Sequence, residues 1–169
     1  MSETRRLSLI AVAAALVLDQ GIKILMLYGF HLINWGMETR VTVLPVLDLV
    51  MRWNCGISFS LLCVNSPSGI AMLITFVMGV TAALAWWMWN ATRRLLAIGL
   101  GLVIGGALGN LVDRLWHGWV ADFFDLHAFG RDFFACNPAD ILISLGVVLL
   151  ITDTLMDSDV RGGRELTAG

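Results

Sequence analysis

The stretch GGALGNLVDRLWHGWVADFFDL, residues 105–126, begins as an apolar helix with spaced glycines and continues into a run rich in aromatic residues. It contains three aspartates, Asp113, Asp122 and Asp125. Glycines at four-residue spacing favour close packing of helices in a membrane. A charged side chain within a membrane is costly unless it is paired, so carboxylates beside such a helix usually serve a function. This stretch therefore predicts a packed membrane helix that leads into a polar site.

The composition of the whole chain is that of an integral membrane protein. Its 169 residues are 58% hydrophobic and only 14% charged. The mean hydropathy of +0.81 lies far above that of soluble domains. The formal net charge of −2 and the scattered basic residues argue against nucleic acid as a partner. We expect a single membrane domain over residues 1–169.

Four apolar stretches are long enough to cross a bilayer, whose hydrocarbon core needs roughly 20 helical residues. Basic residues precede the first stretch, connect the second to the third at Arg93 and Arg94, and follow the fourth. By the positive-inside rule, both termini then lie in the cytoplasm. The sequence predicts a membrane all-α core of four transmembrane helices, at about residues 7–27, 69–89, 95–112 and 139–156.

Two longer segments fall on the outer side in this topology. Residues 28–68 contain the run RVTVLPVLDLVMRW, whose β-branched and apolar residues favour strands. Pro45 is expected to divide this run into two strands. We therefore expect a small extracytoplasmic β-sheet between the first and second helices. Residues 113–138 are expected to form an extracytoplasmic loop, with most of its Trp and Phe side chains in the membrane interface.

Several carboxylates fall at one depth in this topology. At a rise of about 1.5 Å per residue, Asp19 lies roughly 20 Å from Arg6 and therefore in the outer half of the bilayer. Asp113 ends the third span, Asp140 begins the fourth, and Asp122 lies in the loop that joins them. We expect these four side chains to gather near the extracytoplasmic face.

Some aspartates have structural explanations that compete with catalysis. Lys23 follows Asp19 at i+4, so the two charges face the same side and offset each other. That pair favours a structural or substrate-orienting role. Asp113 beside Arg114 favours a positioning ion pair over a catalyst. Asp125 carries no special signal and is expected to be a solvated loop residue.

Asp122 and Asp140 have no basic partner nearby in the sequence. Two carboxylates in close contact cannot both ionise readily, so one keeps a proton while the other stays charged. The ionised member can take a proton from water while the protonated member donates to the carbonyl oxygen of a peptide. The three histidines form no recognisable catalytic constellation, and the three cysteines have no C-x-x-C spacing. The pattern thus favours an aspartate dyad over a catalytic triad, a metal site or a dithiol centre.

Five short stretches occur in order along the chain: LDQGIK at 18–23, WNCGISFS at 53–60, GGALGNLVDR at 105–114, VADFF at 120–124 and CNPADI at 136–141. On these stretches the sequence resembles the bacterial lipoprotein signal peptidases, the signal peptidase II family of membrane aspartic endopeptidases. The resemblance runs from the first span to the fourth. It implies that Asp122 and Asp140 form the catalytic dyad. It also implies a set of residues that shape the site or hold the substrate, namely Asp19, Lys23, Asn54, Gly56, Asn110, Arg114 and Asn137.

The same resemblance implies the substrate and its setting. The substrate would be a prolipoprotein whose cysteine carries diacylglycerol, cut on the amino side of that cysteine. The enzyme would cross the bacterial cytoplasmic (inner) membrane several times, with its active site near the extracytoplasmic face and membrane lipid as a further partner. Water and two carboxylates complete the chemistry, so no metal and no cofactor is implied. We expect a monomer.

The chain departs from the commoner family pattern beside the second aspartate. Pro138 stands where an aliphatic residue is usual, and Ile141 where a small or polar residue is usual. Proline suits a helix start, so we expect the fourth span to begin there. Cys136 is unusual as well. Together with Cys55 and Cys63 it falls on the outer face. The spacing of the three cysteines favours structural thiols, and an oxidising periplasm would permit a disulfide.

The main alternative function is that of a small four-helix proton-coupled membrane transporter, in which intramembrane aspartates bind and release protons. A transporter predicts carboxylates near the bilayer midplane and a pathway to both faces. Carboxylates clustered at one face favour hydrolysis at that face instead. A purely structural membrane subunit would explain the helices and glycines, but not two unpaired aspartates at a shared level.

Overall fold

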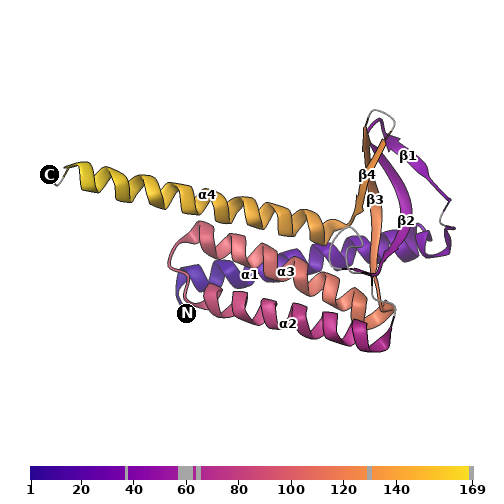
Figure 1. Ribbon diagram of the computed structural model, residues 1–169, viewed down its shortest axis with the longest axis horizontal. Helices are drawn as coiled ribbons and strands as arrows, with labels where there is room; N and C mark the ends of the chain where they lie inside the picture. The colour runs from indigo at the N-terminus through magenta and orange to yellow at the C-terminus, as the bar shows by residue number, and fades with distance from the viewer. Residues whose placement is uncertain (37, 57–62, 64–65, 129–130, 168–169) are drawn as a thin grey trace.

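In the computed structural model, four long helices lie side by side and a small sheet stands at one end of them (Figure 1). The structure describes all residues except 37, 57–62, 64–65, 129–130 and 168–169. The helices are α1 (Glu3–Ile24), α2 (Pro67–Trp89), α3 (Arg94–His117) and α4 (Pro138–Thr167). A π turn, Leu25–Gly29, continues α1, and a short 3₁₀ turn, Leu32–Asn34, follows it. Each of the four helices contains a stretch with the length and apolar composition of a membrane span, which agrees with the predicted all-α membrane core.

The helix ends follow from local sequence. Ser66 caps α2, because its hydroxyl accepts a hydrogen bond from the Gly69 amide at 3.1 Å, and Pro67 occupies the first turn. Helix α3 runs past the predicted end at residue 112 and stops at Gly118, whose φ of 83° suits a left-handed cap. Helix α4 begins at Pro138, as predicted. These helix ends set where the chain enters and leaves the apolar helices.

Helix α3 is the centre of the bundle and contacts the other three helices. Its glycines permit this, because a Cβ on Gly105 would lie 2.5 Å from the Ala15 Cβ of α1. A Cβ on Gly106 would lie 2.7 Å from the Ala139 carbonyl oxygen of α4. The small-residue face predicted from the sequence therefore brings the backbones of α1, α3 and α4 together. This close approach brings the polar residues of α1 and α3 next to the start of α4.

The sheet has four antiparallel strands in the order β1-β2-β3-β4. Strands β1 (Val41–Leu44) and β2 (Leu47–Asn54) come from the predicted sheet segment, and Pro45 lies at the turn between them. Strands β3 (Val120–Ala128) and β4 (Arg131–Cys136) come from the segment that was expected to be a loop. That expectation was wrong.

Strand β3 was missed because most of its residues are buried or half-buried. Phe123 is fully buried and packs in a cluster with Leu32, Met51 and Ala121, instead of lying in the membrane interface. The neighbouring residues of β3 are buried as well, so this strand lacks the clean apolar and polar alternation that marks a strand in sequence. Two of its polar residues, Asp122 and Asp125, accept hydrogen bonds from side chains of other segments.

Asp125 is one of these residues, and the expectation that it is a solvated loop residue was also wrong. Its side chain is fully buried, and its Oδ2 accepts from Arg40 Nη2 at 2.9 Å and from Arg52 Nη2 at 3.1 Å. Asp48 lies opposite Asp125 in the register of β2 and β3. Arg40 also donates to Asp48 Oδ2 at 3.0 Å, so one guanidinium separates two carboxylates that would otherwise repel.

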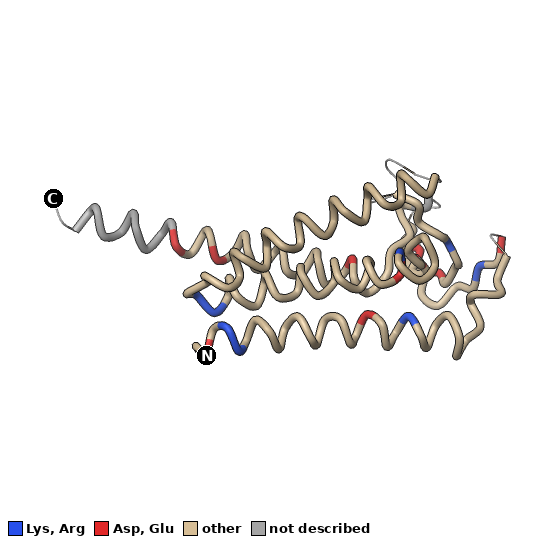
Figure 2. Tube along the Cα trace, turned by 90° about the horizontal axis from the view of Figure 1, so that it is seen from below, with Lys and Arg blue, Asp and Glu red and all other residues tan. Residues whose placement is uncertain are grey.

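Charged residues form two groups along the bundle, one near the start of α1 and one in the half that is nearer the sheet (Figure 2). In the first group, Arg93 pairs with Asp153 at 2.8 Å and with Asp157 at 2.7 Å. Arg94 pairs with Glu3 at 2.9 Å in the same region. The second group contains the carboxylates that the sequence analysis expected at one depth.

Candidate active site

The first turn of α4 holds Asp140 by a reciprocal cap. The Asn137 Oδ1 accepts from the Asp140 amide at 3.3 Å, while Asp140 Oδ2 accepts from the Asn137 amide at 3.1 Å. This is the geometry of a capping box, with Asn137 as the N-cap and Asp140 three residues on. Pro138 fits the position between them because its missing N–H would have no helical partner there. The sequence CNPADI therefore fixes one carboxylate rigidly at a helix start.

Asp122 lies on β3 and shares a partner with Asp140. Its Oδ1 accepts from Asn137 Nδ2 at 2.6 Å, and its Oδ2 accepts from Asn54 Nδ2 at 2.9 Å. Asn137 therefore contacts both carboxylates, one through its side-chain amide and one through its backbone amide. Only 3% of Asp122 is exposed.

Burial and a neighbouring charge set the proton affinity of Asp122. Loss of hydration is the main cause that raises the pKa of Asp122 to about 7, and the nearby charge of Asp140 adds to it. Hydrogen bonds from Asn137 and Asn54 and the charge of Lys23 act in the opposite direction. At neutral pH this carboxyl can therefore both hold and release a proton.

Lys23 is the centre of the polar network beneath these carboxylates. Its side chain is almost completely buried, and its Nζ lies 3.0 Å from Asp19 Oδ2 and 2.9 Å from Asp113 Oδ2. The predicted pairing of Asp19 with Lys23 is therefore present. The predicted partner of Asp113 was wrong: Asp113 pairs with Lys23 from α1, not with its neighbour Arg114. Consecutive residues on a helix do not face each other, and Asp113 instead meets Lys23 from α1.

The two acids bound to Lys23 also hold the backbone beside Asp140 and Asp122. Asp19 Oδ1 accepts from the Ala139 amide at 2.9 Å, and Asp113 Oδ2 accepts from the Ala121 amide at 3.2 Å. Ala139 and Ala121 are the residues that immediately precede Asp140 and Asp122. One buried ion cluster thus anchors both chain segments that carry the candidate dyad, strand β3 and the start of helix α4.

Two further side chains complete the network. Asn110 accepts from Lys23 Nζ at 3.0 Å and donates to Asp140 Oδ1 at 3.1 Å. Arg114 donates to the Gly56 carbonyl oxygen at 2.7 Å and to the Asn110 carbonyl oxygen at 3.2 Å. Asn54 in turn accepts from the Gly56 amide at 3.0 Å. Every site residue named from the sequence therefore belongs to one hydrogen-bonded network.

Gln20 belongs to the same network, although it was not among the site residues predicted from the sequence. Its Nε2 donates to Asp19 Oδ2 at 3.0 Å, to the Gly109 carbonyl oxygen at 3.1 Å and to Asp113 Oδ1 at 3.2 Å. It thus ties α1 to α3 beside the ion cluster. A polar amide within an apolar span, next to Asp19 in LDQGIK, was the signal that could have identified it.

The turn after β2 carries a disulfide next to Asn54, a partner of Asp122. Cys55 and Cys63 are bonded to each other, while Cys136 is a free and buried thiol. Cys55 lies between Asn54 and Gly56, which contact Asp122 and Arg114. Residues 57–60 of the stretch WNCGISFS lie outside the described residues. Within the described part of the chain, no group of three or more His, Cys, Asp or Glu side chains could hold a metal ion.

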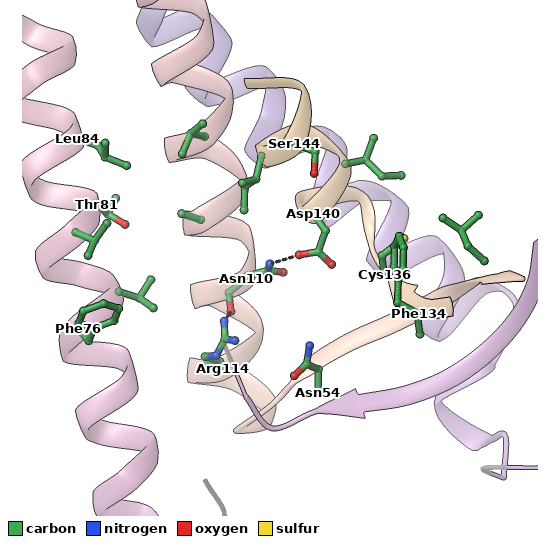
Figure 3. Close-up of a pocket in the computed structure, with 18 residues that line it drawn as sticks. Asn54, Phe76, Thr81, Leu84, Asn110, Arg114, Phe134, Cys136, Asp140 and Ser144 are labelled. Atoms are coloured by element: carbon green, nitrogen blue, oxygen red, sulfur yellow. Dashed lines mark hydrogen bonds between the residues drawn. The ribbon is translucent and has the colours of Figure 1, made fainter. Parts of the chain in front are cut away.

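A cavity of about 560 Å³ opens between α2, α3, α4 and the sheet. Figure 3 shows Asp140, Asn110, Arg114 and Asn54 at one end of it, with Phe76 and Leu84 on the α2 wall. A second cavity of about 180 Å³ is lined by Asp122 and shares Asn54, Phe134 and Ala135 with the first. Asp140 therefore lies where a mostly apolar cavity meets polar donors, which is typical of a ligand site, and Asp122 lines the adjoining smaller cavity.

Gly109→Ala is expected to disturb this network. A Cβ at residue 109 would overlap Asp19 Oδ2, and that carboxylate is held by Lys23, Gln20 and the Ala139 amide. We expect a loss of about 1–3 kcal/mol in the free energy of unfolding, the usual cost of overpacking. Gly79→Ala is the matched control, because a Cβ there meets no atom within 4 Å. Equal thermal stability of the two variants would contradict the described contact.

Comparison with known proteins identifies the family. The family model of signal peptidase II matches residues 11–156. The chain belongs to the signal peptidase II family. It is 44% identical over 155 residues to a lipoprotein signal peptidase of Rhodopseudomonas palustris (strain ATCC BAA-98 / CGA009), with 89% of this chain and 93% of the relative covered. It is 39% identical to a lipoprotein signal peptidase of Nitrobacter hamburgensis, with the same coverage.

Solved structures agree with this membership. A bacterial membrane enzyme determined at 2.3 Å resolution matches with a TM-score of 0.75 and 25% identity, over 89% of this chain and 88% of the other. A second bacterial membrane enzyme matches with a TM-score of 0.72 at the same identity. The signal peptidase II family consists of membrane aspartic peptidases, so the chain is a peptidase of this type. The resemblance read from the five stretches is confirmed.

Proposed function

We propose that this signal peptidase II family member removes the signal peptide from diacylglyceryl-modified prolipoproteins by cleaving on the amino side of the lipidated cysteine. One observation carries the proposal: Asn137 joins Asp122 on β3 to Asp140 on α4, and Asp140 lies at the polar end of an apolar cavity. Buried paired carboxylates are suited to hydrolysis by an activated water. The names of the relatives support the choice of substrate.

The chemistry follows from one proton shared by two carboxyls. The ionised carboxylate takes a proton from water, and the oxygen of that water bonds to the carbonyl carbon of the scissile peptide. The protonated carboxyl donates to the carbonyl oxygen, which gives a neutral tetrahedral diol. The C–N bond then breaks as a carboxyl donates a proton to the leaving amine and the other takes a proton from the diol. Asn54, Asn110 and Asn137 would hold the carboxylates in place without adding charge.

The distribution of basic residues supports catalysis at the outer face. The basic residues Arg5, Arg6, Arg93 and Arg94 lie at the ends of helices away from the sheet, which favours cytoplasmic termini. The sheet and the dyad would then lie at the extracytoplasmic end. Val41, Val43, Leu44 and Val46 around the first hairpin expose apolar side chains, as a sheet resting on a membrane surface would. Since the whole network comes from one chain, we propose that a monomer is active.

The cavity suits a substrate that is part peptide and part lipid. Its walls are mainly apolar, and its polar end carries Arg114. The guanidinium has several N–H donors and uses Nη1 and Nη2 on the carbonyl oxygens of Asn110 and Gly56. Its remaining donors would be available to an ester carbonyl of the diacylglyceryl group.

Lipid dependence tests the proposal. The purified protein would be incubated with a synthetic precursor peptide in two forms, with and without diacylglycerol on the cysteine. Cleavage of only the lipidated form is expected, because contacts of the lipid with the apolar cavity would supply binding energy that the unlipidated form lacks. Cleavage of neither form, or equal cleavage of both, would contradict the proposed substrate. Proton flux across vesicles in place of cleavage would favour the transporter alternative.

The rate of cleavage is expected to fall as the pH rises above about 7. The pKa of Asp122 is raised to about 7, so its proton is present below that pH and lost above it. The pair then carries two negative charges and has no acid to protonate the carbonyl oxygen. We expect kcat/KM to fall about tenfold for each pH unit well above the pKa. Enzyme held at pH 9 and assayed at pH 6 is the control for unfolding. A flat profile from pH 6 to 9 would contradict the role of Asp122.

A further inference from the structure

Two hydroxyl groups face the large cavity deeper than the dyad. Thr81 on α2 and Ser144 on α4 both line it, and Figure 3 shows them on facing walls, with Asp140 one helical turn from Ser144. Thr81 is only 8% exposed and Ser144 is exposed, and both belong to the cavity lining. The wall around them is otherwise apolar, with Val80, Leu84 and Ile143 among the lining residues.

Three other threonines on α2 and α4 behave differently. Thr75 on α2 donates to the Ala71 carbonyl oxygen at 2.8 Å, and Thr152 and Thr154 on α4 donate to carbonyl oxygens four residues back at 2.9 Å. Thr81 and Ser144 make no such bond, nor any other hydrogen bond to the described residues. A hydroxyl left without a partner in apolar surroundings is costly. These two hydroxyls are therefore placed to receive a polar group from a ligand.

The substrate must bring such groups to this depth. A helical peptide uses its backbone N–H and C=O groups internally, so the scissile carbonyl is accessible to the dyad only where the helix is unwound. Unwinding leaves backbone groups unsatisfied in an apolar environment, which costs free energy. Ser144 lies four residues beyond Asp140, about 6 Å further into the bilayer on the same helix face. The Ser144 hydroxyl would thus be level with the substrate segment just before the cleaved bond.

We propose that Thr81 and Ser144 bind the backbone of the unwound substrate segment that precedes the scissile peptide bond. The inference rests on the proposed function. A hydroxyl can donate to a backbone carbonyl oxygen or accept from a backbone amide, so it fits either group. Recognition of the backbone does not depend on side-chain identity. The same two residues can therefore serve precursors whose signal peptides differ in sequence.

Paired variants test this inference on one lipidated precursor peptide. Thr81→Val and Ser144→Ala remove the hydroxyls with little change in shape, and each is expected to lower kcat/KM about 3- to 10-fold, the usual effect of one hydrogen bond. Thr75→Val and Thr152→Val are the matched controls on the same two helices, with hydroxyls bonded to their own backbone. The controls are expected to keep the wild-type kcat/KM. Thermal unfolding of all four variants checks that the fold is retained.

Ester substitution in the peptide identifies the contact. A backbone ester, placed in turn at each of the four positions before the scissile bond, removes one N–H and weakens the neighbouring carbonyl as an acceptor. At one position the ester is expected to lower wild-type kcat/KM and to cause no further loss in Thr81→Val or Ser144→Ala, the signature of a coupled pair. If Thr81→Val and Ser144→Ala match their controls, or if ester and variant losses multiply at every position, the inference is wrong. Failure of the wild type to cut the all-amide peptide would overturn the proposed function as well.

Discussion

Asp122→Asn and Asp140→Asn are each expected to lower kcat for cleavage by roughly 10⁴-fold, the upper range for general acid–base catalysis. The amide keeps the shape of the side chain but cannot cycle a proton. Each oxygen of both carboxylates accepts a hydrogen bond from Asn54, Asn110 or Asn137. One donor will therefore face an amide N–H₂ in each variant, so a loss of about 1–3 kcal/mol in stability accompanies the loss of activity. Rate and thermal unfolding are measured on the same preparations.

Asp125→Asn is the matched control for these variants. Asp125 lies three residues after Asp122 on the same strand and is fully buried, but its partners are Arg40 and Arg52. Its replacement is expected to lower stability while kcat stays within about threefold of the wild type, since that carboxylate is outside the dyad. If Asp122→Asn or Asp140→Asn retained wild-type kcat, or if Asp125→Asn lost activity to the same extent, the dyad assignment would be wrong.

Lys23→Met is expected to lower the free energy of unfolding by about 3–5 kcal/mol, the usual cost of breaking a buried ion pair from one side. The variant leaves Asp19 and Asp113 in a buried site without their cation. These are also the carboxylates that bind the backbone beside Asp140 and Asp122. We therefore expect cleavage activity to fall with stability. Unfolding by denaturant in detergent micelles measures the first effect.

A second substitution separates charge from packing. Asp113→Asn added to Lys23→Met removes one of the two unpaired charges, so the double variant is expected to regain part of the lost stability. A simple cavity left by the lysine stem would not be repaired in this way. If the double variant is less stable than Lys23→Met by the full cost of Asp113→Asn alone, the ion cluster does not act as a unit.

The depth of a residue along its helix could be predicted from the sequence, whereas the rotation of one helix against another could not. Rise per residue placed Asp19 and Asp113 at a common level, and i,i+4 spacing paired Asp19 with Lys23 on a single helix. The contact of Lys23 with Asp113 joins two helices and depends on how α1 and α3 are rotated against each other. That rotation is set by the packing of Gly105 on Ala15, which no spacing within one helix encodes.

The sheet was predictable only in part, for a related reason. The hairpin of β1 and β2 has β-branched residues and Pro45 at its turn, so local sequence indicates it. Strand β3 has aspartates at positions that local sequence assigns to solvent. Asp125 is buried because Arg40 and Arg52 arrive from distant parts of the chain. Long-range ion pairs of this kind override local preference.

The proposed cleavage by Asp122 and Asp140 before a lipidated cysteine can be tested by the products of one reaction. A lipidated precursor would be incubated with the wild type and with Asp140→Asn, and the products would be identified by mass spectrometry. From the wild type we expect a free signal peptide and a product that begins with diacylglyceryl-cysteine. From Asp140→Asn we expect intact precursor. The same two products from Asp140→Asn, or a wild-type cut at any other bond, would contradict the proposed cleavage.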